Sequence, residues 1–412
     1  MRSESGPPGE LPPILSISPY EEEHMFSRFE LIRWWEQKRL SEARVLVIGA
    51  GALGNEIIKN LALLGIGNVI LVDFDRIEPS NLSRSVLFRE RDRGRYKAEV
   101  AAERARDLYP GIWIKPLCVN AVTDLGLGVF YWADVIIGGL DNREARLVIN
   151  QNSFRAGKPW IDGAIEVLNG VARVFAPGDG PCYECTMSQI DWKVLNSRKA
   201  CTLLTREEMM SGKTPTTPTM ASIIAGIQCQ EALKLLHGLE TISGKGYIFE
   251  GLNFNNDLIG YKRKPDCFSH ECFSPLTVLD AGAATLTLGD ALARIRADLG
   301  PDAVMEIRQD VLTGFTCSIC GIETEHHASL GRIHETEAAC PSCKEQRFPQ
   351  LAHQFDGTEP WQGKTLAQLG IPPFDVFIGR EGERQTYYLL DGDRAEILGP
   401  LAEPVVKPVA KA

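Results

Sequence analysis

The chain has 412 residues, which is long enough for two or three domains. Charged residues make up 24% of it and hydrophobic residues 44%, so a globular protein is expected rather than a disordered one. The formal net charge of −10 argues against general binding to nucleic acid or to an anionic membrane surface. No apolar run approaches the roughly 20 residues of a membrane span, and residues 1–20 read as a disordered lead-in without the apolar core of a signal peptide. We therefore expect a cytoplasmic protein.

The predicted elements begin with a helix over Glu21–Leu40 and continue with a strand–turn–helix–strand unit. Residues 45–48 form an apolar run typical of a buried parallel strand. The run ends in a G-x-G-x-x-G turn made by Gly49, Gly51 and Gly54. Glycines at this spacing let backbone N–H groups approach a phosphate at the start of a helix, here from about Ala52 to Leu64. The next strand, residues 69–72, leads to Asp73, where an acidic residue meets a ribose hydroxyl, so the unit predicts a nucleotide site.

Strands and helices go on alternating beyond this unit. Further helices are predicted over Lys97–Leu108 and Arg143–Phe154, and further strands over residues 113–118, 134–138, 159–165 and 170–175. Residues 214–218, T-P-T-T-P, cannot be helical because proline lacks an N–H donor, and an amphipathic helix follows from Thr219 to Gly238. The alternation predicts an α/β fold with a doubly wound, Rossmann-like sheet that binds ligand at the carboxyl ends of its strands.

Further polar residues distinguish this nucleotide site from that of a dehydrogenase. Asn81 and Arg84 lie in N-L-S-R, Lys97 lies in Y-K-A, and Asp141 follows the apolar strand 134–138. Arginine and lysine neutralise a polyphosphate, and an aspartate can hold Mg²⁺. These residues predict phosphate chemistry. A solvated charged loop followed by a helix cap is the alternative interpretation.

These motifs carry a resemblance to a known family. Residues 28–238 resemble the adenylating enzymes that activate ubiquitin-like proteins, a family that includes the enzymes for the molybdopterin and thiamine sulfur carriers. The resemblance implies ATP and Mg²⁺, with Asp141 positioning the metal and nucleotide contacts from Gly49, Gly51, Gly54, Asp73, Asp75, Asn81, Arg84 and Lys97. Arg28, in F-S-R-F, matches the arginine that reaches into a partner's site, which implies a homodimer. Ser85 departs from the glutamine that the family usually has directly after the arginine of the N-L-x-R motif, here Arg84.

Two C-x-x-C pairs in the second half of the chain predict a zinc site. Of the eleven cysteines, six form such pairs, which in a large chain without a signal points to metal rather than to disulfides. Nineteen residues separate the pairs Cys317/Cys320 and Cys340/Cys343, a spacing that suits tetrahedral zinc. The histidines between the pairs could replace one ligand; they are His326, His327 and His334.

The third pair, Cys182/Cys185, needs distant partners to form a metal site. The best candidates are Cys267 and Cys272. The resemblance supports them, because these enzymes often carry a zinc held by two such pairs. The C-x-x-x-x-C spacing departs from the family pattern, and His270 is an alternative ligand.

Cys201 is the candidate nucleophile. Arg198 and Lys199 precede it, and nearby positive charge favours the thiolate. Ubiquitin-activating enzymes carry their thioester-forming cysteine in a similar Cys-Thr-Leu context, so the resemblance implies a catalytic-cysteine segment at about 186–218 within an adenylation domain of residues 21–272. A plain, partly buried cysteine is the alternative.

Residues 273–400 form the predicted C-terminal domain. A helix is expected over Leu286–Leu299, a short helix over Thr365–Leu369, and strands over residues 376–378 and 386–390. The segment resembles the ubiquitin-fold domain that ends eukaryotic activating enzymes and recruits the conjugating enzyme, with the zinc ribbon (about 315–348) as an insertion. An unrelated α+β appendage is the alternative, and residues 401–412 read as a flexible tail.

The combined motifs imply an activating enzyme for a ubiquitin-like protein that ends in glycine. It would adenylate the terminal carboxylate, form a thioester on Cys201 and pass the acyl group to a conjugating enzyme. A sulfur-carrier adenylyltransferase, an NAD-dependent oxidoreductase and a non-catalytic zinc scaffold are the alternatives. Because Arg28 and a ubiquitin-fold tail share one chain, the sequence also resembles activating enzymes of bacterial ubiquitin-like conjugation operons, some of them linked to phage defence. The sequence names neither the partner nor its final target.

Overall fold

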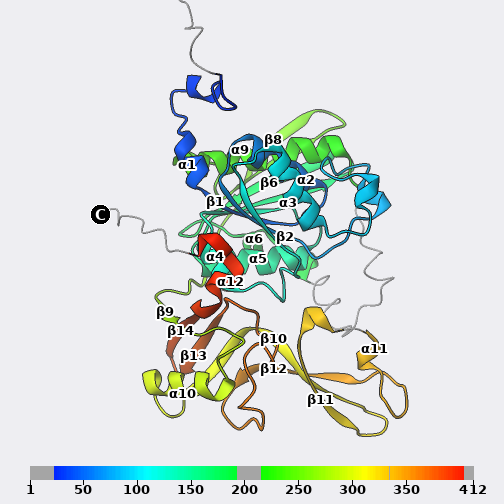
Figure 1. The fold of residues 1–412 in the computed structure, drawn as a ribbon, viewed down its shortest axis with the longest axis vertical. Coiled ribbons are helices and arrows are strands. Elements are labelled where there is room, and N and C mark those ends of the chain that lie inside the picture. Colours follow the sequence, from blue (N-terminus) through cyan, green and yellow to red (C-terminus); the bar gives the residue numbers. More distant parts are fainter. Residues whose placement is uncertain (1–22, 193–214, 334, 403–412) are drawn as a thin grey trace, which may run out of the picture.

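The structure is a computed structural model that describes residues 23–192, 215–333 and 335–402. It contains an eight-stranded and a six-stranded sheet, one above the other in Figure 1. None of the described helices is both long and apolar enough to cross a membrane.

The eight-stranded sheet is parallel on one side and antiparallel on the other. Its strands are β1 (Arg44–Ile48), β2 (Asn68–Val72), β3 (Trp113–Leu117), β4 (Val135–Gly138), β5 (Trp160–Glu166), β6 (Asn169–Phe175), β7 (Lys245–Glu250) and β8 (Asn255–Gly260). The order is β3-β2-β1-β4-β5-β6-β7-β8, and the first five strands are parallel. The remaining strands pair antiparallel. The parallel half is the predicted Rossmann-like sheet, whereas β7 and β8 were not predicted.

Helices cover both faces of this sheet. Apolar side chains of α2 (Ala52–Leu63), α3 (Lys97–Leu108) and α9 (Pro218–His237) pack on one face, against a core that includes Val45 and Val47. On the other face, α4 (Leu127–Trp132), α5 (Arg143–Arg155) and α6 (Tyr183–Thr186) pack in a core that includes Leu46 and Ile48. Because successive side chains of a strand point to opposite faces, the continuous apolar run of β1 serves both cores.

Two predictions near the helices need correction. Within the described part of residues 21–40, only η1 (Phe29–Leu31) and the start of α1 (Gln37–Glu42) are helical. Trp34 and Trp35 of this segment pack against His237 at the end of α9, with ring centroids 5.3 and 5.6 Å from that of the histidine. Pro218, predicted to be non-helical, is the first residue of α9, where a missing N–H costs no helical hydrogen bond.

The six-stranded sheet and its helices form a second-sheet domain. Its elements are β9 (Leu276–Leu279), α10 (Leu288–Leu299), β10 (Val304–Thr316), β11 (Glu323–Ser329), α11 (Glu335–Ala338), β12 (Phe348–Phe355), β13 (Val376–Glu381), β14 (Arg384–Leu390) and α12 (Arg394–Leu398). The strand order is β11-β10-β13-β14-β9, and β12 pairs with β10. The helix expected over Thr365–Leu369 is instead a turn, because Leu366 donates its N–H to Leu286 and Thr365 bridges to Thr287.

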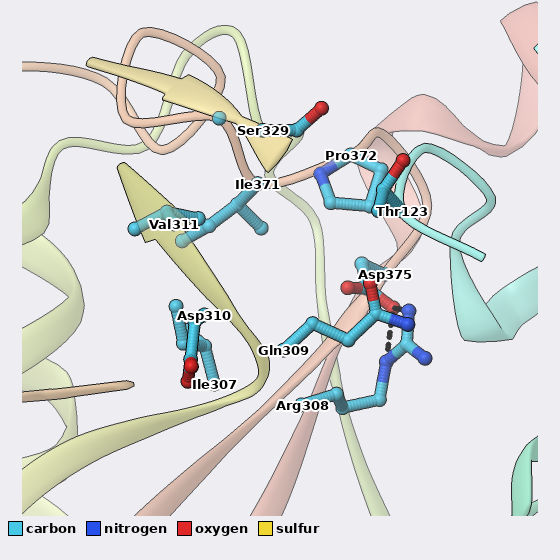
Figure 2. A pocket seen from close by; sticks show the side chains of 11 residues that line it. Thr123, Ile307, Arg308, Gln309, Asp310, Val311, Ser329, Ile371, Pro372 and Asp375 are labelled. Atoms are coloured by element: carbon cyan, nitrogen blue, oxygen red, sulfur yellow. Dashed lines mark hydrogen bonds and ion pairs between the residues drawn. The ribbon is translucent and has the colours of Figure 1, made fainter. Parts of the chain in front are cut away.

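A buried ion pair fixes this domain against α4 and α5. Arg308 of β10 lies 2.5 Å from the Asp375 carboxylate and donates to Asn152 of α5 (2.9 Å). Asp375 also accepts the N–H of Leu127 at the start of α4 (2.8 Å). Figure 2 shows Arg308 and Asp375 pointing toward each other beside a small cavity that Thr123 also lines. The two domains therefore share a polar clamp as well as one hydrophobic core.

Candidate active site

The glycine turn between β1 and α2 is tight on one side and open on the other. A Cβ added to Gly49 would lie 2.5 Å from the carbonyl oxygen of Gly139, and one added to Gly54 would lie 1.9 Å from that of Gly49. Gly49 also has a φ of +99°, which side-chain-bearing residues rarely adopt. A Cβ added to Gly51, by contrast, would meet no atom within 4 Å. The open space at Gly51 is where a phosphate can approach the first N–H groups of α2.

Asp73, at the carboxyl end of β2, holds this turn. One carboxylate oxygen accepts the N–H of Ala50 (2.7 Å), and the other accepts the N–H of Asp75 (2.8 Å). Burial raises the pKa of the Asp73 carboxyl above its ordinary range, although the charge of Lys97 works in the opposite direction. Asp73 therefore lies where an acidic residue contacts a ribose in this class of fold.

Lys97 begins α3 and is paired with Asp75. Its Nζ lies 2.7 Å from a carboxylate oxygen of Asp75, and its backbone N–H donates to the carbonyl of the same residue (2.9 Å). The lysine is 9% exposed, whereas about half of the Asp75 side chain is exposed. The structure thus places both predicted residues together, with the ammonium group held by a carboxylate next to Asp73.

Asn81 and Arg84 lie in the segment between Asp75 and Lys97. The Asn81 side chain accepts the N–H of Glu78 (2.9 Å) and so closes its own 3₁₀ turn. Arg84 is half-buried and makes no side-chain hydrogen bond or ion pair with another residue that the structure describes. Ser85, which stands where the family usually has glutamine, is buried, and its hydroxyl has no partner among the described residues.

Asp141 lies beyond the carboxyl end of β4 and is exposed. Its carboxylate accepts a hydrogen bond from the Asn142 amide (3.1 Å), and Asn142 caps α5. An exposed carboxylate at the ligand-binding edge fits Mg²⁺, which prefers oxygen ligands. Arg28 is also exposed and pairs with Glu23 (3.2 Å), and among the described residues no hydrogen bond or ion pair joins it to the glycine turn. Cys201 lies outside the described residues.

The first cysteine cluster differs from its prediction in one ligand. The ligand atoms of Cys182, Cys185, Cys267 and His270 all lie within 4.8 Å of one another. Sγ of Cys182 is 3.5 Å from that of Cys267, and Sγ of Cys185 is 3.4 Å from Nε2 of His270. The predicted ligand Cys272 is exposed and lies outside this group, because the 3₁₀ turn η4 (Phe268–His270) brings His270 toward the sulfurs. Three thiolates and one imidazole are a donor set that suits structural zinc.

The second cluster contains the four predicted cysteines. Sγ of Cys317 lies 3.5 Å from that of Cys343, and Sγ of Cys320 lies 3.5 Å from that of Cys340. His326 and His327 are not members of the group, and His334 lies outside the described residues. This four-sulfur arrangement also fits tetrahedral zinc.

Several supporting residues were missed by sequence reasoning. Asp162, at 0% exposure in β5, pairs with Arg146 of α5 (3.0 Å) and Arg173 of β6 (2.6 Å). Charged residues inside otherwise apolar strands were the available signal. The amide of Asn55 and the carboxylate of Asp92, both buried, support the glycine turn and the segment after Arg84.

The ThiF family model matches residues 22–269, a range that includes the glycine turn and the three cysteines of the first cluster but neither His270 nor the second-sheet domain. The chain belongs to the ThiF family.

Similar proteins carry several functional names. A NEDD8-activating enzyme E1 catalytic subunit from Arabidopsis thaliana is 41% identical over 157 residues, which are 35% of this chain and 34% of that protein. A SAMP-activating enzyme E1 from Haloferax volcanii is 32% identical over 56% of this chain and 81% of its own length. A sulfur carrier protein adenylyltransferase from Thermus thermophilus is 30% identical over 56% of this chain and 83% of its own. The chain thus spans about a third of the first of these relatives and most of the other two.

A solved structure supports the fold. The crystal structure of E. coli MccB with ATP superposes with a TM-score of 0.51 at 23% identity, covering 61% of this chain and 75% of that one.

Proposed function

We propose that this ThiF family protein uses ATP to adenylate the C-terminal carboxylate of a ubiquitin-like protein that ends in glycine. The observation that carries the proposal is the open glycine turn next to Asp73. Asp75, two positions after Asp73, holds the ammonium group of Lys97 close to this turn. The relatives named as activating enzymes or adenylyltransferases support it. Neither of these supports hydride transfer, for which Arg84, Lys97 and Asp141 would have no use.

The first step replaces a poor leaving group with a better one. A carboxylate oxygen of the substrate attacks the α-phosphorus of ATP, a new P–O bond forms, and the bond to pyrophosphate breaks. Arg84 and Lys97 would neutralise the phosphate charge that develops, with Lys97 exchanging Asp75 for a phosphate oxygen. Asp141 would hold Mg²⁺, which when bound supplies further charge neutralisation.

The second step would use Cys201. Its thiolate attacks the acyl carbon, the S–C bond forms, the C–O bond to AMP breaks, and a thioester results. The support is the sequence around it, with Arg198 and Lys199 before the cysteine. The second-sheet domain would then act as the ubiquitin-fold-like platform for a conjugating enzyme.

We also propose a homodimer in which Arg28 completes the partner's site. Its exposure and its lack of contact with the glycine turn in its own chain agree with such a role. A solution mass of one chain by light scattering would contradict it. The association with bacterial conjugation operons and phage defence is likewise a proposal, which a neighbouring gene for a small glycine-ending protein would support.

A sulfur-carrier adenylyltransferase is the second candidate. It is favoured by the Thermus thermophilus relative, which the match covers over 83% of its length. It would carry out the same first step and needs neither a thioester on Cys201 nor a conjugating enzyme. The second-sheet domain, which lies outside the ThiF match, weighs toward the first candidate.

Two assays with the same candidate partner test the proposal. ATP–pyrophosphate exchange reports adenylation, and a reductant-sensitive band on a non-reducing gel reports the thioester. Cys201→Ala should keep exchange and lose the band, whereas the matched control Cys118→Ala should keep both, because burial raises the pKa of the Cys118 thiol to about 11. Exchange without any band in the unaltered protein would favour the sulfur-carrier function. Absence of exchange with every glycine-ending partner tested would contradict both candidates.

A further inference from the structure

The segment between the acidic strand end and α3 is long but tied together at its base. Residues 78–96, here called the cation loop, carry Asn81 and Arg84 and lead into Lys97. Gly94 donates its backbone N–H to the Ile77 carbonyl (2.9 Å), Ile77 donates to the carbonyl of Arg95 (2.9 Å), and Lys97 donates to that of Asp75 (2.9 Å). Loops of this length without strands or long helices are uncommon in compact domains and are usually functional or mobile. This one has a closed base that starts beside Asp73.

Asn55 joins the cation loop to the glycine turn. It lies on α2 at 0% exposure and uses both ends of its amide. Its Nδ2 donates to the carbonyls of Ala50 (2.7 Å) and Gly51 (3.1 Å), while its Oδ1 accepts the N–H of Leu87 (3.0 Å). One side chain therefore fixes the backbone three residues after Arg84 relative to the turn that would hold the phosphates.

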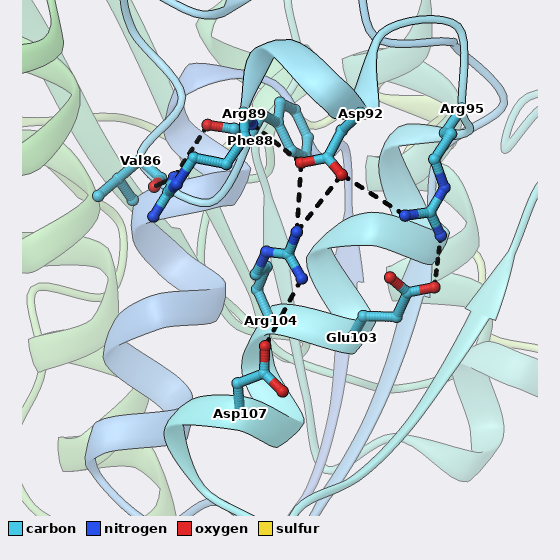
Figure 3. Close-up of polar contacts among 8 residues, drawn as sticks. All are labelled: Val86, Phe88, Arg89, Asp92, Arg95, Glu103, Arg104 and Asp107. Atoms are coloured by element: carbon cyan, nitrogen blue, oxygen red, sulfur yellow. Dashed lines mark hydrogen bonds and ion pairs between the residues drawn. The ribbon is translucent and has the colours of Figure 1, made fainter.

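Asp92 fastens the other side of the loop to α3, as Figure 3 shows. The carboxylate is 1% exposed and accepts the N–H of Arg89 (2.9 Å). It also pairs with Arg104 of α3 (3.3 Å) and Arg95 (3.5 Å). Because Lys97 is the first residue of α3, this anchor fixes the loop relative to the helix that carries the lysine.

We infer that the cation loop is a preformed clamp for the phosphates of ATP, in which Asn55 and Asp92 are positioning residues. The inference rests on the proposed function for the identity of the ligand. Both side chains are buried and bonded to other groups of the protein, so neither would contact the nucleotide itself. They hold Arg84 and Lys97 in place before ATP binds, so that binding does not have to order the loop.

The inference predicts a difference between nucleotides. AMP offers its ribose to Asp73 and one phosphate to the glycine turn, whereas ATP adds two phosphates that only the cations of the loop would meet. Loosening the loop should therefore weaken ATP binding more than AMP binding. A general loss of structure would weaken both alike.

The test is calorimetric titration of the full chain with ATP and with AMP, both in the presence of Mg²⁺. Asn55→Ser should raise the dissociation constant for ATP roughly tenfold, the effect of losing about one hydrogen-bonded anchor. The rise for AMP should be smaller, about threefold or less, because Asn55 also supports the turn at Ala50 and Gly51. Asp92→Asn should give the same pattern and carries the test if Asn55→Ser does not fold. The matched control is Asn68→Ser, because Asn68 also donates to a backbone carbonyl (Ala43, 3.2 Å), but at the opposite end of β2 from Asp73.

Equal weakening of ATP and AMP, or no weakening of either, would overturn the positioning role. The outcomes also separate this inference from the proposed function. An unaltered protein that binds no ATP would contradict the proposed function itself. If the unaltered protein binds ATP and the Asn55→Ser and Asp92→Asn variants bind it with the same affinity, only the inference is contradicted.

Discussion

The nucleotide edge of the first sheet and the region where the two domains meet are built from different kinds of contact. Every predicted ATP contact from Gly49 to Asp141 lies within one stretch of sequence, and the glycine turn and Asp73 are joined across 23 positions. The first cysteine cluster joins residues 85 positions apart, and the junction joins Leu127 to Asp375 across 248. The first kind of contact is set by local strand–turn–helix geometry, whereas the second exists only once the whole chain has folded.

This contrast predicts two separable roles. Damage to the distant contacts should reduce the free energy of unfolding while the folded fraction still binds nucleotide. Damage to the local contacts should reduce nucleotide affinity in the folded protein, whatever its effect on the free energy of unfolding. The predictions below can contradict that separation, and they are ordered by expected size.

The largest effect is expected from His270→Ala. The substitution removes one of four ligands from a cluster that ties α6 to the segment before β9, so one zinc per chain should be lost. Because metal binding contributes directly to folding, the free energy of unfolding should fall on the order of 5 kcal/mol. Metal analysis and chemical denaturation measure the two effects.

The matched control for this prediction is Cys272→Ala. Cys272 was the fourth ligand expected from sequence but is exposed and outside the cluster, so both zinc content and stability should be unchanged. Loss of zinc in Cys272→Ala but not in His270→Ala would restore the sequence-based assignment.

The two cysteine clusters show which contacts can be predicted from sequence. The second cluster was predicted completely, because its four cysteines lie in two knuckles whose spacing alone brings them together. α3 was predicted with the bounds it has, since its Ala-rich periodic pattern is local. His270 was named only as an alternative ligand, and β7 and β8 were not predicted, because turns and pairings far along the chain decide them.

Charged residues gave the weakest sequence signal. Asp92 lies in the run E-R-D-R-G-R, which resembles any solvated loop, and its partner Arg104 follows twelve residues later on a helix. Asn55 comes directly after the last glycine of the turn, and nothing in its position shows that its amide reaches Leu87. Cys201 stays a prediction from sequence, because it lies outside the described residues.

The junction should show the next largest effect. Arg308→Met leaves the buried Asp375 carboxylate without its guanidinium partner, since both side chains are under 10% exposed. Breaking a buried pair by removing one member should lower the free energy of unfolding by about 3 kcal/mol, which denaturant titration measures. ATP affinity in the folded fraction should change less than about twofold, because Arg308 and Asp375 contact none of the predicted nucleotide-binding residues.

The exposed pair of Arg294 and Asp298 on α10 provides the control for the junction. Arg294→Met removes an arginine from a solvent-exposed ion pair in the same domain and should cost well under about 1 kcal/mol. A loss of ATP affinity in Arg308→Met as large as its loss of stability would mean that the two regions are coupled, and the proposed separation would be wrong.

The smallest effect is expected at the nucleotide edge, from acidification. Burial raises the pKa of Asp73, and both carboxylate oxygens accept backbone N–H groups, so protonation must weaken at least one of these bonds as well as the ribose contact. The affinity for ATP should therefore be full above this raised pKa and fall by up to about tenfold in total as the pH drops through it. The charge of Lys97 lowers the pKa of this carboxyl, whereas that of Asp75 raises it.

Because the phosphates of ATP titrate too, the measurement needs 2′,3′-dideoxy-ATP as the reference, which carries the same phosphates without the hydroxyls that Asp73 would bind. The ratio of the two affinities should narrow as the pH falls, whereas a ratio that stays constant would mean that Asp73 does not bind the ribose.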